Sequence, residues 1–109
     1  MAVVYVKKGD RYPLLAATLQ LEDGTAIDLS SGSVKFRMST QHGQNLVNTT
    51  ATIVSAAAGT VRYDWAVGDT DVVGKFRGEF EATLASGRIV TVPNDSYIDI
   101  RIQDSVPTG

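Results

Sequence analysis

Hydrophobic and polar residues alternate along most of this chain in short runs. In residues 75–84, Phe76, Phe80 and Ala82 alternate with charged side chains. A period of two residues is typical of a β-strand that buries one of its faces. Similar runs predict strands over 3–7, 12–21, 26–29, 33–39, 46–54, 60–65, 75–84, 89–92 and 97–102. Helical periodicity is nearly absent, so we expect an all-β fold.

Turn-forming residues separate these runs. Residues 22–25 predict a tight turn in which Gly24 is free to take a positive φ, and Pro93 ends the strand before it. Residues 66–74 break the alternation, and their spacing predicts one turn of helix that links two sheets. Asp69 or Thr70 would cap this turn and Gly74 would close it. Residues 103–109 are expected to fray.

The chain has 109 residues, which is the size of one domain with a core that needs no metal or disulfide. Sequential hairpins and one short crossover helix turn favour an Ig-like sandwich of two antiparallel sheets over a closed barrel. The sequence has no cysteine, which excludes disulfides, zinc thiolates and thiol nucleophiles. A net charge of −2 without a Lys/Arg cluster argues against nucleic acid or a membrane as a partner. The first residues show no export signal, so assembly in the cytoplasm is expected.

No residue pattern predicts catalysis, a metal or a cofactor. His42 is the single histidine and lies in a polar stretch, and no serine stands in a Gly-x-Ser-x-Gly motif. Residues 68–71 resemble the start of a calcium loop, but the later oxygen ligands are missing. Glu79 and Glu81 have the form of a glycosidase pair, but neighbouring basic residues predict a solvated face with cross-strand ion pairs. We therefore disfavour a small hydrolase.

Most aromatic residues share the phase of the core positions, as Tyr63, Trp65, Phe76 and Phe80 do. The candidates for exposed rings are Tyr5, Tyr12 and Tyr97. A row of exposed rings would suit a carbohydrate-binding module, which is the alternative to a protein-interaction role.

Several motifs follow one another in a definite order along nearly the whole chain. They are Val6-Lys7-Lys8-Gly9-Asp10 with Pro13-Leu14, Leu21-Glu22-Asp23-Gly24-Thr25-Ala26-Ile27-Asp28-Leu29, Val34-x-Phe36-x-Met38, Gly59-x-Val61-x-Tyr63-x-Trp65, Asp69-Thr70, Gly74-x-Phe76-x-Gly78-Glu79-Phe80-Glu81, Gly87-x-Ile89-x-Thr91-x-Pro93 and Ile98-x-Ile100. This series resembles the Ig-like N-terminal domain of tailed-phage baseplate upper proteins.

The resemblance implies a non-enzymatic structural protein of a phage virion that acts through protein–protein contacts. Its expected partners are other virion proteins and further copies of itself in a symmetric assembly. Proteins of that family carry further helical and fibre-like regions after this domain, whereas this sequence stops at Gly109. The resemblance therefore leaves open whether the expected position is in the baseplate, at the head–tail connector or on the capsid. The expected contact surface is a strand edge, and the segments expected to engage a neighbour are the edge strand at 3–7 and the C-terminal tail. The candidate residues at this edge are Val3, Val4 and Tyr5, with Tyr12 and Tyr97.

Overall fold

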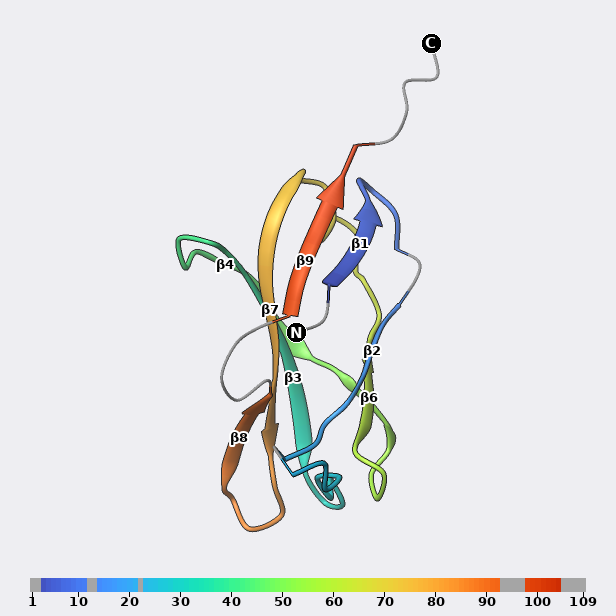
Figure 1. Cartoon of the computed structure of the whole chain (residues 1–109), viewed down its shortest axis with the longest axis vertical. Helices are drawn as coiled ribbons and strands as arrows, with labels where there is room; N and C mark the ends of the chain where they lie inside the picture. The colour runs from blue at the N-terminus through green and yellow to red at the C-terminus, as the bar shows by residue number, and fades with distance from the viewer. Residues whose placement is uncertain (1–2, 12–13, 22, 93–97, 105–109) are drawn as a thin grey trace.

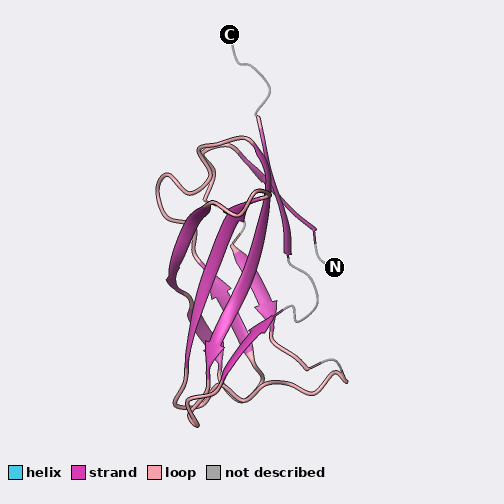
Figure 2. Ribbon diagram, turned by 90° about the vertical axis from the view of Figure 1, so that its left-hand side faces the viewer, coloured by secondary structure: helices cyan, strands magenta, loops and turns pink. Residues whose placement is uncertain are grey.

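A computed structural model describes residues 3–11, 14–21, 23–92 and 98–104. The described residues form strands and no helix, and two sheets pack face to face as a sandwich (Figures 1 and 2). The expected all-β sandwich is therefore confirmed. The strands are β1 (Val3–Lys7), β2 (Leu15–Thr18), β3 (Ser33–Thr40), β4 (Asn45–Thr50), β5 (Thr52–Ser55), β6 (Thr60–Tyr63), β7 (Gly74–Thr83), β8 (Ile89–Val92) and β9 (Ile98–Gln103).

The larger sheet has the strand order β1-β9-β7-β3-β4, and the smaller sheet has the order β2-β6-β5. β9 pairs with the first half of β7 and β8 with the second half, so β8 and β9 lie end to end along one side of β7 (Figure 1). β1 pairs with β9 in parallel, which corrects the expectation of purely antiparallel sheets. A parallel pair needs a long connection, and here most of the domain lies between the two strands.

The predicted strand over 46–54 is two strands in different sheets. β4 belongs to the larger sheet and β5 to the smaller one, and the chain changes sheet at Ala51. Ala51 is buried, and its amide donates a 2.8 Å hydrogen bond to the carbonyl of Val34. The predicted strand over 26–29 is reduced to a single bridge between Gln20 and Ala26. Local alternation continues through such a corner, because both sheets bury one face against the same core.

The segment between β6 and β7 links the two sheets, as expected, but the predicted turn of helix does not form there. Residues 66–71 make two tight turns, with Asp69 N donating to Ala66 O at 3.1 Å and Asp71 N donating to Gly68 O at 3.3 Å. The carboxylate of Asp69 accepts the amide hydrogen of Ala66 at 2.9 Å. A helix cap accepts amides that follow it in the chain. Asp69 instead accepts an amide that precedes it, so it closes a loop.

The core is centred on Phe36, which has no solvent exposure. Its ring stacks on Tyr63 at a centroid distance of 4.6 Å and meets Phe80 at 5.3 Å and the edge of Trp65 at 6.0 Å. Pairs of this kind each add about 1 kcal/mol beyond the area they bury. The two sheets are therefore joined by one aromatic cluster, and the inward phase predicted for Tyr63, Trp65, Phe76 and Phe80 is confirmed. Within the described residues, no helix is long and apolar enough to cross a membrane.

Candidate interaction surfaces

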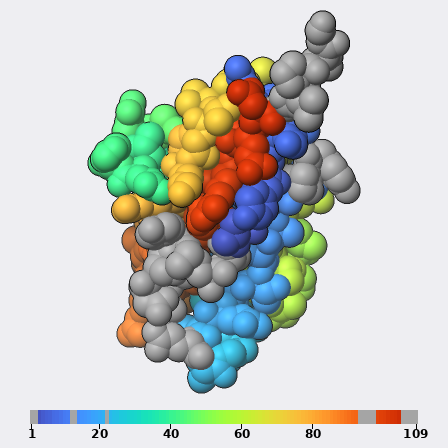
Figure 3. All heavy atoms as spheres, turned by 45° about the horizontal axis from the view of Figure 1, so that its top comes forward, coloured from blue at the N-terminus to red at the C-terminus, as the bar shows by residue number. Residues whose placement is uncertain are grey.

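β1 forms one edge of the larger sheet, and none of the described strands pairs with the backbone on its outer side. Figure 3 shows it in dark blue on the surface beside β9 in red. The side chains of Val3 and Tyr5 are 44% and 55% exposed, while Val4 packs against the core. Of these three expected edge residues, Val4 therefore anchors the strand, whereas Val3 and Tyr5 face solvent.

Tyr5 is paired in register with Arg101 of β9. The Arg101 guanidinium donates a 3.0 Å hydrogen bond to Oδ2 of Asp99, and this bond raises the pKa of Arg101 above its ordinary value. The outer face of the β1 edge thus presents an exposed phenol next to an arginine whose charge is already matched. An aromatic ring beside an arginine is a common composition for a protein contact.

Pro93, Tyr12 and Tyr97 lie outside the described residues. Among the described aromatic residues, Tyr5 is the exposed one, whereas the other rings are buried. The described part of the chain therefore shows one exposed ring and no row of them.

Glu79 and Glu81 lie on the outer face of β7, where Glu79 is opposite Arg37 of β3 and Glu81 is opposite Lys35. Arg37 Nη1 is 4.0 Å from Glu79 Oε1, and Nη2 contacts Glu81 Oε2. Arg37 Nε is buried without a hydrogen-bond partner. Two carboxylates that face one guanidinium suit cross-strand ion pairing better than acid–base catalysis.

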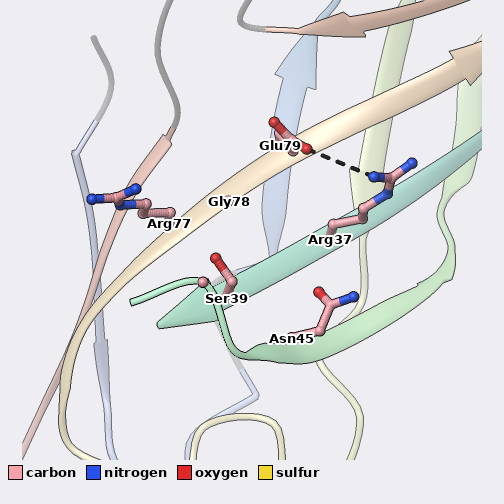
Figure 4. A pocket seen from close by; sticks show the side chains of 7 residues that line it. Arg37, Ser39, Asn45, Arg77, Gly78 and Glu79 are labelled. Atoms are coloured by element: carbon pink, nitrogen blue, oxygen red, sulfur yellow. Dashed lines mark ion pairs between the residues drawn. The ribbon is translucent and has the colours of Figure 1, made fainter. Parts of the chain in front are cut away.

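Arg37 also lines a depression of about 330 Å³ between β7 and the β3–β4 hairpin (Figure 4). The rest of its lining comprises Ser39, Gly43, Asn45, Arg77, Gly78 and Glu79. The alternating pattern does not predict the role of Arg37 or this depression, because both depend on the register between β3 and β7. A signal was present in the alternating charges of the two strands, but it did not specify which residues meet.

Thr70 is 1% exposed and connects two loops at one end of the sandwich. Its hydroxyl donates a 2.8 Å hydrogen bond to the carbonyl of Asp10, and its own carbonyl accepts one from the amide of Gly9 at 3.0 Å. In the same segment, the hydroxyl of Tyr63 donates to Asp69 Oδ2. Thr70 and Asp69 therefore hold the β6–β7 connection against the rest of the fold.

The turn glycines occupy conformations that favour glycine. Gly24 has a φ of 89°, and the neighbouring Asp23 carboxylate accepts the amide hydrogen of Thr25 at 2.9 Å. Gly74 has a φ of 152° and begins β7. Both glycines therefore have a structural role, because they allow the backbone conformations of the turn at Gly24 and of the start of β7.

His42 lies in the exposed loop between β3 and β4, where its backbone amide donates to Thr40 Oγ1 at 3.3 Å. In the part of the chain that the structure describes, no three acidic or histidine side chains gather in a group that could hold a metal ion.

No family model matches this chain, and no curated protein matches it. Among solved structures, it is similar to CopC from Methylosinus trichosporium OB3b, with a TM-score of 0.58 and 14% identity over 100% of this chain and 91% of that one. It is also similar to the N-terminal domain of phage TP901-1 ORF48, with a TM-score of 0.58 and 17% identity over 96% of this chain and 86% of that one. At these identities the likeness shows a shared β-sandwich fold.

Proposed function

We propose that this chain is a structural protein of a phage or prophage virion, in the baseplate, the tail or the head–tail region, and that it acts as a protein–protein interaction module. The observation that carries the proposal is the likeness to the N-terminal domain of a phage protein over 96% of the chain. The ordered series of turn and strand motifs supports the same class of protein. The fold alone hosts many functions, so the role must be tested directly.

The proposed module works without catalysis, and its contacts are made by exposed strand edges. β1 is the first candidate because no strand in the described part of the chain pairs with its outer side and because Val3 and Tyr5 are exposed. A partner strand could extend the sheet there, with Tyr5 packing against the partner. The partners are other virion proteins and further copies of the chain in a symmetric assembly.

The localisation is tested by quantitative mass spectrometry of purified virions from the strain that encodes the chain. The expected result is the chain at a constant ratio to the major tail protein through a density gradient. Virions that contain the tail proteins but lack this chain would overturn the proposal.

The contact surface is tested by binding of the purified chain to each tail and head–tail protein encoded near its gene. Tyr5→Glu should weaken the interaction, because it places a charge at the centre of the edge, whereas Ser33→Glu at an exposed position of β3 should not. A binding isotherm with host polysaccharide is measured in parallel. Saturable sugar binding without any virion partner would favour the carbohydrate-binding alternative.

A further inference from the structure

Basic side chains from three strands gather on the outer face of the larger sheet. β1, β9 and the start of β7 lie side by side there, and Figure 3 shows them in dark blue, red and yellow. Their outward positions carry Lys7 on β1, Arg101 on β9, and Lys75 and Arg77 on β7. We call these four residues the basic patch. Among the outward positions that the structure describes on these segments, Asp99 of β9 is the one acid.

The face that holds the basic patch is positive, although the whole chain has a formal charge of −2. Basic side chains outnumber acidic ones by six to three at the outward positions described for the larger sheet. They are Lys7, Lys35, Arg37, Lys75, Arg77 and Arg101, against Glu79, Glu81 and Asp99. The negative charge of the chain therefore lies elsewhere, and this face is a separate positive surface.

Two ion pairs on this face turn their cations outward. In the pair between Arg101 and Asp99, the arginine side chain is 36% exposed and the aspartate side chain 18%. Arg37 is likewise more exposed than its partner Glu81. Within the described residues, no ion pair involves Lys75, which is exposed. The face therefore presents positive charge to solvent even where it carries acids.

Two cations of the basic patch face each other across neighbouring strands. Lys75 of β7 is directly opposite Arg101 of β9 in the antiparallel register. Like charges at opposite positions destabilise a sheet. Asp99, which is opposite Arg77, pairs with Arg101 and matches its charge. Proteins break such local rules of stability at functional sites, so the like-charge pair indicates a role in binding.

We propose that the basic patch binds an acidic segment of a partner protein. The occupant follows from charge complementarity, because Asp and Glu side chains accept strong hydrogen bonds from exposed guanidinium and ammonium groups. Tyr5 is opposite Arg101 at the β1 edge and adds an exposed ring to the same surface. Tyrosine and arginine are enriched at the centres of protein interfaces. The proposal rests on the proposed interaction role, because it names the chemistry of the partner in that role.

The depression beside the basic patch offers a place for one acidic side chain of such a segment. Arg37 and Arg77 line it, and Glu79 is the one acid among the described residues of its lining (Figure 4). Ser39 and Asn45 add a hydroxyl and an amide, both of which can donate hydrogen bonds to a carboxylate. Its volume of about 330 Å³ is near the lower limit of ligand sites, about 300–1,000 Å³, so it suits a single side chain.

A nucleic acid is a poorer match for this surface. Its binding depends on a basic surface that neutralises many phosphates in a row. Asp99 lies within the basic patch and Glu79 lies beside it, so a continuous phosphate backbone would meet both carboxylates. A peptide can place acidic residues against the cations and neutral residues against these two acids.

Fluorescence anisotropy measures the binding of a labelled peptide of alternating glutamate and glycine to the intact chain. The expected result is saturable binding that weakens as sodium chloride is added, without binding of the matching glutamine peptide. Lys75→Glu should raise the dissociation constant about fivefold or more, because it replaces attraction with repulsion. Arg88→Glu, between β7 and β8, changes the net charge equally and should change the dissociation constant less than about twofold. No saturable binding by the parent chain, or an equal loss in both variants, would overturn the proposal.

Lys75→Gln separates binding from folding. It removes the charge opposite Arg101, so the urea midpoint in low salt should not fall, whereas the peptide should bind more weakly. Circular dichroism confirms that each variant folds. A lower urea midpoint with unchanged peptide binding would show that Lys75 serves the fold and would contradict the proposal.

A labelled single-stranded DNA oligonucleotide of the same charge as the peptide is titrated in parallel. Tighter binding of DNA than of the peptide would overturn the acidic protein partner. The binding assays with tail and head–tail proteins separate this proposal from the proposed function. A virion partner that binds the parent and Lys75→Glu equally would overturn the basic patch and leave the proposed function in place. Peptide binding without any virion partner would support the basic patch and count against the proposed function.

Discussion

The hydroxyl of Tyr63 donates a hydrogen bond to Asp69 Oδ2, and the same carboxylate oxygen accepts the amide hydrogen of Ala66. Tyr63 ends β6 in the smaller sheet, and Asp69 lies in the connection to β7 in the larger one. Because the tyrosine ring also stacks on Phe36, this bond ties the crossing between sheets to the aromatic core.

Tyr63→Phe keeps the ring in the core but removes the hydroxyl. The loss of a hydrogen bond to a carboxylate should lower the free energy of unfolding by about 1.5 kcal/mol. Burial, together with the hydrogen bond to Asp69, raises the pKa of Tyr63 above its ordinary value. The hydroxyl therefore stabilises the fold below about pH 10, and this contribution is lost as the pH rises above that value. Urea unfolding at pH 7 and pH 11 checks both effects. A variant with the parent's stability at pH 7 would contradict the first.

Gly78→Ala should destabilise the domain through crowding. A Cβ at this position would lie 2.6 Å from Ile100 Cδ1 and 3.2 Å from Phe36 Cε1, and both residues are fully buried. Overpacking of this kind costs about 2 kcal/mol. Ile100→Val removes Cδ1, so the double variant should lose less stability than the sum of the two single variants. Strict additivity in the double-mutant cycle would refute this account.

Thr70→Val should loosen the link between two loops. The variant keeps the volume but removes the hydroxyl that donates to Asp10 O, at a cost of about 1 kcal/mol. The amide of Gly9 donates to the Thr70 carbonyl, so its hydrogen exchange should accelerate more than that of amides in β7. Uniform acceleration across the domain would indicate global destabilisation alone.

Arg37→Met should cost about 1 kcal/mol or less, since its side chain is partly exposed and its ion pairs are screened. The variant leaves Glu79 and Glu81 without their shared cation, so the loss should shrink in high salt. Chemical unfolding with urea in low and high sodium chloride measures the difference. A loss that is independent of salt would assign the role of Arg37 to packing.

Two turn aspartates should contribute to stability against acid. The amide and side-chain hydrogen bonds of Thr25 lower the pKa of Asp23, and those of Ser30 lower the pKa of Asp28. Because both values are depressed in the folded state, their contribution is present above about pH 4 and is lost as the pH falls through the folded-state pKa values. In the Asp23→Asn, Asp28→Asn double variant, unfolding between pH 5 and pH 2 should depend less on pH. If the double variant and the parent chain showed the same dependence of unfolding on pH in this range, Asp23 and Asp28 would have no role in stability against acid.

Alternation alone predicted the strands that run through the core. The inward positions of β7 and β9 followed from the sequence, as did the hairpin that joins β7 to β8, because burial of every second side chain is a local property of a strand. The break in the alternation at 66–74 likewise predicts the link between the sheets, but the turn of helix that it also predicts does not form.

The sequence by itself determined that the chain buries one side of each of many short strands and that its aromatic residues meet inside. The tertiary structure decided which strands are neighbours. It made β1 parallel to β9, moved the chain between sheets at Ala51, and placed Arg37 between two glutamates more than forty positions away. Periodicity reports which face of a strand is buried, whereas pairing depends on contacts between segments far apart in the chain. The ion pairs between strands on the outer face of the larger sheet therefore become visible only when the strands are assembled.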